Sequence, residues 1–461
     1  MIDNIKLANY KSFFADQVKE AIDEQQKINR SQMRNLFKTG ELSLAYVDSI
    51  QHETGMIILK CPRRMAPRLK VLKGVCIIKK GAKQALGEHV TEWICRWDEF
   101  VDNKDFHSSG SDMTPMYYVH TGDSNYDYVA CSGFSFKLYD ILSKALVDGK
   151  SLSLIVHNPF PPVEYFRNLA SYMDAFSSND ELNLEPTIDY EEWTPEELAF
   201  DEQKPTGISD TIIDTLANEH CCIVQGPPGT GKSYTIASVI SSYLDAGKTV
   251  CVTTMANKGL IELIKQKPLQ KYVKEGRVSK TNLSIDERKQ VSGVKAASAD
   301  LQVPGGEMLC ATNYQLSSVF SEKKMTLYGL PQYDLVVIEE ASQAFFTAIV
   351  AFKQLGIDCL IVGDPMQLPP IVKLNNPQYN SWNVATQVEG LKSMVLGTSI
   401  KSYRIVTTFR LTSRSASLTK CFYGNRFVSV KQDYLDFTKA NSVLFPQDGG
   451  VLYHCTLDVR N

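Results

Sequence analysis

Residues 221–240 read CCIVQGPPGTGKSYTIASVI. An apolar run at 221–225 precedes a glycine-rich turn, and a run with helical spacing follows the turn. Residues 226–233 fit the pattern G-x-x-x-x-G-K-[ST], in which glycines let backbone N–H groups close around phosphate oxygens. The N-terminus of the next helix adds its dipole to this site. A strand, a phosphate loop and a helix in this order predict an α/β domain that binds a nucleotide.

The loop residues have separate expected tasks. Lys232 is expected to reach the β- and γ-phosphates, and Ser233 to ligate Mg²⁺. ATP and Mg²⁺ are therefore the predicted cofactors. The predicted nucleotide-binding residues are Gly226, Pro227, Pro228, Gly229, Thr230, Gly231, Lys232, Ser233 and Tyr234.

A second apolar run, in DLVVIEEASQ (334–343), ends in two adjacent carboxylates. Two like charges at the end of a strand are explained if a magnesium ion lies between them and the phosphates. We expect Glu339 to hold the metal and Glu340 to polarise the attacking water as general base. A strand end that simply turns out to solvent is the structural alternative.

From about residue 208, strand-like runs alternate with helical stretches, which is typical of an α/β fold with a parallel sheet. The predicted strands are 221–225, 249–254, 308–311, 334–338 and 359–363. Residues 9–37 have helical spacing, and short strand-like pieces from 42 to about 156 predict a small β-rich module.

The net charge of −3 over 461 residues is too small to indicate a partner, so only local charge is informative. Residues 60–83 carry nine Lys or Arg and no acid, including Arg63, Arg64 and Arg68. These side chains form either a solvated loop face or a surface that contacts nucleic-acid phosphates. Residues 178–202 carry ten acids and no base, which predicts a loosely ordered linker.

The N-terminus lacks an apolar signal segment, and no run approaches 18 apolar residues, so neither a signal peptide nor a membrane span is expected. The eleven cysteines include no CxxC pair. We expect buried, reduced thiols and a cytoplasmic, intracellular protein without a membrane partner.

Five segments together resemble the motifs of superfamily 1B helicases, in the order and spacing of that family. The chain is most similar to the group that contains the nonsense-mediated-decay helicase and the immunoglobulin mu-binding-protein helicase. The resemblance covers about residues 205–426. Its segments are GPPGTGKS (226–233), TTMANKGL (253–260), EEASQA (339–344), GDPMQLPP (363–370) and TTFRLT (407–412) followed by CFYGNR (421–426).

The resemblance implies further roles. Gln367 would sense the γ-phosphate, Arg410 would contact it as an arginine finger, and Phe409 would stack on adenine. A face that binds single-stranded DNA or RNA would include Asn257, Lys258 and Thr312. For Asn257 and Thr312, ordinary turn or strand-end chemistry is the alternative.

The same resemblance divides the chain. It implies a stalk helix at 1–37, a barrel-like β-rich module at 38–160 and a helix with an acidic linker at 161–204. A first RecA-like ATPase domain would occupy 205–400, and a second, truncated one would begin at 401–461. The first contains an insert at 261–305, whose residues 261–295 carry nine Lys or Arg. That insert lies either over the nucleic-acid channel or on a solvated face.

Three departures from the family pattern affect the expected activity. Glu339 replaces an aspartate, and residues 207–220 lack the glutamine that normally precedes the phosphate loop. The chain also stops near GGVLYHC (449–455), so we expect a fragment that binds nucleotide but turns it over poorly. The leading hypothesis is a 5′-to-3′ helicase or translocase. A nucleotide-binding switch without unwinding is the alternative, and the N-terminal module is a candidate for docking a protein partner.

Overall fold

The chain separates into two compact units, Met1–Ala15 with Glu164–Asn461, and Asp16–Val163. Arg63, Arg64, Arg68 and the predicted strand at 449–455 lie outside the described residues. In this computed structural model the described residues are 4–32, 34–36, 43–51, 53–54, 56–62, 71–72, 75–78, 114–119, 125–131, 143, 153–156, 163–177, 180–182, 184, 194–283, 285–298, 300–321, 330–372 and 382–431.

The first unit is built on a nine-stranded sheet in the order β12-β11-β13-β10-β14-β15-β9-β16-β8. All eight neighbouring pairs are parallel, which confirms the predicted α/β class. The strands are β8 Glu196–Leu198, β9 Cys221–Gln225, β10 Val250–Thr254, β11 Val278–Lys280, β12 Lys295–Ala296, β13 Met308–Thr312, β14 Tyr333–Ile338, β15 Gly356–Gly363 and β16 Lys401–Ile405.

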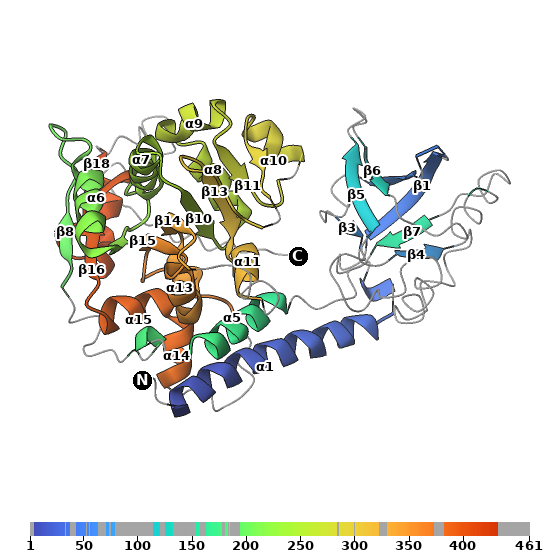
Figure 1. Ribbon diagram of the computed structural model, residues 1–461, viewed down its shortest axis with the longest axis horizontal. Coiled ribbons are helices and arrows are strands. Elements are labelled where there is room, and N and C mark those ends of the chain that lie inside the picture. Colours follow the sequence, from blue (N-terminus) through green and yellow to red (C-terminus); the bar gives the residue numbers. More distant parts are fainter. Residues whose placement is uncertain are drawn as a thin grey trace, which may run out of the picture. The chain divides into compact units, whose positions relative to one another are not determined.

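The central strands are buried on both faces, as continuous apolar runs in parallel sheets usually are. In β9, Cys221 and Ile223 face one core, while Cys222 and Val224 face the other. Helices cover both faces, so the unit has three layers (Figure 1). Its helices are the first part of α1 Asn4–Asn29, α5 Glu164–Ala175, α6 Gly207–Glu219, α7 Lys232–Asp245, α8 Asn257–Ile264, α9 Gln270–Lys274, α10 Ile285–Gln290, α11 Asn313–Leu316, α13 Phe346–Lys353, α14 Trp382–Val388, α15 Gly390–Gly397, α16 Ser413–Leu418 and α17 Lys420–Tyr423.

The two cores have different compositions. One core contains the apolar faces of α6, α7 and α8. The other contains α5, α13 and the first part of α1, where Tyr10, Phe13 and Phe14 meet Phe345 and Phe346. The described short 3₁₀ turns are η2 Asp180–Leu182, η3 Lys267–Leu269, η4 Ser317–Phe320 and η5 Ala341–Gln343.

Four predicted boundaries need correction. The boundary at residue 400 is wrong, because β16 at 401–405 pairs with β9 and completes the same sheet. The acidic stretch is not a linker throughout, since β8 at 196–198 pairs with β16. The insert at 261–305 contains β11 and β12, which extend the sheet beside β13. The first helix covers Asn4–Asn29 rather than residues 9–37.

The second unit contains a seven-stranded sheet in the order β3-β5-β6-β2-β1-β7-β4, and its neighbouring strands are antiparallel. These strands lie within the region that the sequence predicts to be rich in β-structure, and closure into a barrel stays a prediction. The strands are β1 Ser43–Gln51, β2 Met56–Pro62, β3 Val71–Leu72, β4 Val75–Ile78, β5 Thr114–Val119, β6 Tyr126–Cys131 and β7 Ser153–Val156.

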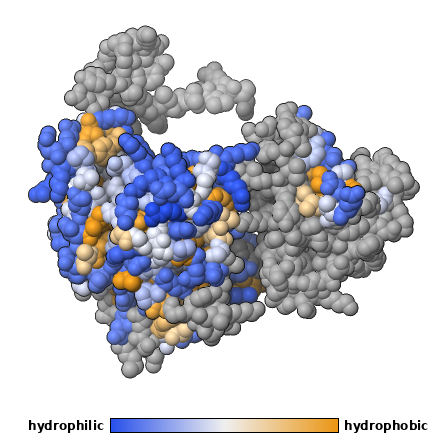
Figure 2. All heavy atoms as spheres, turned by 45° about the horizontal axis from the view of Figure 1, so that its top comes forward, coloured by the Kyte–Doolittle hydropathy of each residue, from blue (hydrophilic) through white to orange (hydrophobic). Residues whose placement is uncertain are grey.

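The visible surface of the described residues is mostly hydrophilic, with separate apolar patches (Figure 2). Among the helices that the structure describes, none has both the length and the apolar content needed to cross a membrane. Six cysteines are described as free thiols, of which only Cys421 is exposed.

Candidate nucleotide site

Parallel strands bring the predicted motifs together because their carboxyl ends meet at one edge of the sheet. Ile338 at the end of β14 is paired with Thr253 of β10 and with Ile361 of β15. Gly363 at the end of β15 is paired with Gln225 of β9. The phosphate loop, the two carboxylates and the GDPMQLPP segment therefore all begin at neighbouring positions on this edge.

The phosphate loop between β9 and α7 depends on its glycines. Gly229 and Gly231 adopt φ angles of +78° and +77°, which L-residues rarely adopt. A Cβ on Gly226 would lie 2.4 Å from Cγ of Lys232. Thr230 Oγ1 donates to the Pro227 carbonyl at 2.9 Å and braces the turn from inside. The loop can therefore wrap closely around an anion at the start of α7.

Lys232 lies at the mouth of this loop. Its Nζ donates to the carbonyl of Gly226 and, at 3.3 Å, to that of Pro227. Burial lowers the pKa of Lys232, and the nearby carboxylates of Asp364 and Glu339 oppose that shift. The ammonium is therefore held between the loop carbonyls and a set of acidic side chains.

Ser233 and Glu339 form a two-residue oxygen cluster. Ser233 Oγ donates to Glu339 Oε1 at 3.1 Å. Glu339 is buried, and its Oε2 is a buried oxygen without a hydrogen-bond partner. Burial raises the pKa of Glu339 to about 7; Glu340 adds to the rise, while the Ser233 hydrogen bond and Lys232 oppose it. A hydroxyl and an unsatisfied carboxylate oxygen are the donors that Mg²⁺ prefers, so the residues present fit this ion.

Glu340 follows in a different environment. It is half-buried and adopts φ 53° and ψ 38°, in the left-handed region that is uncommon for a side chain other than glycine or asparagine. Its carbonyl accepts from Gln343 N–H at 2.8 Å, and its Oε2 accepts from Thr254 Oγ1 at 3.2 Å. The adjacent carboxylates thus separate, Glu339 toward Ser233 and Glu340 toward the end of β10.

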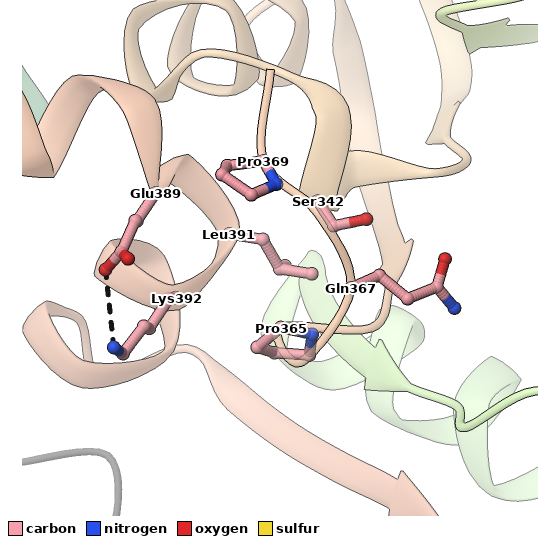
Figure 3. Close-up of a pocket in the computed structure, with 7 residues that line it drawn as sticks. All are labelled: Ser342, Pro365, Gln367, Pro369, Glu389, Leu391 and Lys392. Carbon is pink, nitrogen blue, oxygen red and sulfur yellow. Dashed lines mark ion pairs between the residues drawn. The ribbon is translucent and has the colours of Figure 1, made fainter. Parts of the chain in front are cut away.

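Gln367 is exposed and is bonded to a residue that sequence reasoning left without a role. Gln367 Nε2 donates to Oδ2 of the buried Asp364 at 3.1 Å, and Tyr423 OH donates to the same oxygen at 3.0 Å. The Gln367 side chain points away from the Glu389–Lys392 ion pair across a small pocket (Figure 3). Asp364 and Tyr423 both lie inside quoted motif segments, so the motif match was the signal that could have found them.

The segment β17, Thr407–Thr412, lies directly on the phosphate loop. Phe409 N–H donates to the Gly229 carbonyl at 2.8 Å, and Thr408 Oγ1 donates to the Pro228 carbonyl at 3.1 Å. A Cβ on Gly229 would lie 2.2 Å from Cβ of Arg410. The structure therefore brings Phe409 and Arg410 to the loop, 180 residues away in sequence. β17 pairs in parallel with β18, Val428–Lys431.

Two aromatic side chains beside the loop are available to a base. The Phe409 ring is 40% exposed and makes an edge contact with Phe200, with ring centroids 5.0 Å apart. Phe200 was not predicted, because it lies in the acidic stretch that the composition marks as a linker. Tyr234 is 51% exposed on the first turn of α7.

The predicted strand-contact residues fall into two groups. Asn257 and Lys258 are exposed at the start of α8, where the fully buried Lys280 donates to Asn257 Oδ1 at 2.7 Å. Thr312 is buried and caps α11 in a reciprocal capping box with Gln315. Its contacts support the strand-end alternative, and its place on a strand-binding face stays a prediction.

Residues 209–373 match the family model of the AAA domain. The DNA replication ATP-dependent helicase/nuclease dna2 of Schizosaccharomyces pombe is 29% identical over 245 residues, 49% of this chain and 16% of that protein. The DNA replication ATP-dependent helicase/nuclease DNA2 of Saccharomyces cerevisiae is 26% identical over 207 residues, 42% of this chain and 12% of that protein. The chain therefore matches less than a fifth of the length of these relatives.

A solved structure of an arterivirus nonstructural protein 10 helicase, in complex with DNA, is 14% identical and covers 48% of this chain and 44% of its own. Its TM-score of 0.28 is too low to bear on the fold described above. The matching domain model, the two curated relatives and the arrangement of the phosphate loop support the superfamily 1 helicase assignment that the sequence motifs predict.

Proposed function

We propose that this chain contains the nucleotide-binding part of an ATP-dependent nucleic-acid helicase or translocase that moves 5′ to 3′ along a single strand. One observation carries the proposal: Ser233 Oγ and the buried Glu339 carboxylate lie 3.1 Å apart at the mouth of the phosphate loop. The loop and this pair offer both partners that a magnesium–nucleotide complex requires. The names of the two relatives favour DNA as the strand.

In the proposed mechanism, a magnesium ion held by Ser233 and Glu339 would neutralise charge on the phosphate oxygens. Lys232 exchanges its loop carbonyls for β- and γ-phosphate oxygens, and Arg410 adds its guanidinium to the γ-phosphate. Glu340 accepts the proton of the attacking water. Gln367 then reports the state of the γ-phosphate through its bond to Asp364.

The finer features of the proposal rest on the resemblance to the nonsense-mediated-decay and immunoglobulin mu-binding-protein helicases. A second RecA-like domain would complete the hydrolysis site and supply a further arginine. We therefore expect slow turnover by this chain alone, and an intracellular protein. Contacts with the strand would run mainly to phosphate and sugar and would weaken with salt.

The test is ATP turnover by the chain with and without a single-stranded oligonucleotide, at several Mg²⁺ concentrations. The proposal predicts that turnover requires Mg²⁺ and rises with the oligonucleotide. Nucleotide binding that is independent of Mg²⁺ would refute the assigned metal pair.

The alternative function is a nucleotide-controlled switch that moves no strand. The longer Glu339 carboxylate, in place of the usual aspartate, is the observation that favours it. A duplex-unwinding assay separates the two functions, because a switch should separate no strands at any ATP concentration.

A further inference from the structure

A fully buried hydroxyl lies against the proposed general base. Thr254 is 0% exposed, and its Oγ1 donates to Glu340 Oε2 at 3.2 Å. Thr254 is the last residue of β10, and Glu340 follows β14, the next strand in the sheet. A hydroxyl that donates to a carboxylate oxygen can fix the direction of that carboxylate.

The backbone at Glu340 needs such support. Its left-handed conformation at φ 53° is unfavourable for a residue with a Cβ and persists only where neighbouring groups hold it. The preceding residue is anchored to the same strand, because Glu339 N–H donates to the Thr253 carbonyl at 2.8 Å. The end of β10 therefore holds both carboxylate residues, one through its backbone and the other through its side chain.

The bond also lies against the helix that begins at the proposed strand-contact residues. A Cβ on Gly259 of α8 would lie 3.2 Å from Thr254 Oγ1 and 3.8 Å from Glu340 Oε2. The glycine thus lets the α8 backbone approach both partners of the bond. Asn257, at the start of the same helix, is two residues from Gly259, so a shift of this end of α8 acts directly on the Thr254–Glu340 contact.

We propose that Thr254 is a positioning residue for Glu340, and that it makes the orientation of this carboxylate sensitive to what contacts the start of α8. The inference rests on the proposed function, since it assumes that Glu340 is the base and that α8 meets the strand. Thr254 itself touches neither phosphate nor water in this scheme.

The experiment compares Thr254→Val, which keeps the shape and removes the hydroxyl, with Thr254→Ser, which keeps the hydroxyl. The full chain, in excess over ATP, is used to measure single-turnover hydrolysis, and a fluorescent ATP analogue measures nucleotide affinity. Thr253→Val is the matched control, because it removes a neighbouring buried hydroxyl that donates to Asn313 at 2.8 Å instead. Glu340→Gln is measured in parallel.

We expect Thr254→Val to slow hydrolysis roughly tenfold, the size that the loss of one hydrogen bond to a charged group gives, with nucleotide affinity within about twofold of wild type. Thr254→Ser and Thr253→Val should hydrolyse ATP at nearly the wild-type rate. A single-stranded oligonucleotide should raise the rate of the wild type and have little effect on Thr254→Val. If the valine variant does not fold, Thr254→Ala carries the same prediction.

Wild-type hydrolysis by Thr254→Val, with Glu340→Gln inactive, would overturn the inference and leave the proposed function standing. A serine variant as slow as the valine variant would also overturn it, since the hydroxyl would not be the cause. Unimpaired hydrolysis by Glu340→Gln would instead refute the role of Glu340 in the proposed function, and the inference with it.

Discussion

Replacing Gly229 by alanine tests the contact between β17 and the phosphate loop. Gly229 has a φ of +78°, and the added Cβ would lie 2.2 Å from Cβ of Arg410. The left-handed conformation costs alanine about 1–2 kcal/mol, and an overpacked contact that only the backbone can relieve costs about 1–3 kcal/mol more. The two costs fall on the loop that must close around the phosphates.

The chain provides a matched control in Gly247. Its φ is +74°, and a Cβ there would meet nothing within 4 Å, so Gly247→Ala carries the backbone cost alone. Urea denaturation of the two variants should therefore show Gly229→Ala to be less stable by about 1–3 kcal/mol. If about 2 kcal/mol of this cost opposes the closed loop, ATP affinity falls roughly 30-fold in Gly229→Ala, whereas Gly247→Ala binds as wild type.

The assay is titration of both variants with a fluorescent ATP analogue, in parallel with the denaturation series. Equal stability of the two variants, together with wild-type affinity in Gly229→Ala, would refute the reasoning. It would mean that Thr407–Thr412 does not lie on the loop, and that Phe409 and Arg410 are not part of the site.

Three further predictions concern the charged residues. Lys232→Ala should lose most ATP affinity in the same titration, because no other ammonium is placed at the loop mouth among the described residues, while the exposed Lys204→Ala should not. Glu340→Gln should bind ATP normally and block hydrolysis, since the amide accepts no proton; unchanged single-turnover rates would move the base elsewhere. The raised pKa of Glu339, about 7, means that protons occupy this carboxyl below that pH. Mg²⁺-dependent ATP binding should therefore weaken as the pH falls from 8 to 6, and a Glu339→Gln variant should lack this dependence.

The sequence predicted the parts of the fold that have strong local signals. All five predicted central strands are present, because buried parallel strands are continuous apolar runs. The edge strands β8, β11, β12 and β16 were missed. They are short or half-solvated, and β8 lies among acidic residues whose composition indicates a linker. Their pairing partners, such as β9 for β16, are nearly 180 residues away.

The same division holds for the site. The phosphate loop and the carboxylates after β14 were predicted because each is one local motif in a strand–turn–helix context. The Thr254–Glu340 bond spans 86 residues, and Lys280 reaches Asn257 across 23. Such contacts depend on strand order and register, which local patterns do not specify. Thr312 shows the opposite error, since a motif position proved to be a helix cap.

The central claim is that nucleotide and single strand bind to one coupled unit. The most direct measurement is the fluorescence anisotropy of a labelled single-stranded oligonucleotide, titrated with the chain in the absence and presence of Mg²⁺ and a non-hydrolysable ATP analogue. Coupled sites predict that the analogue changes the oligonucleotide Kd by about fivefold or more, and that Lys232→Ala removes the change. An oligonucleotide Kd that is the same with and without the analogue, or no oligonucleotide binding at all, would contradict the helicase account.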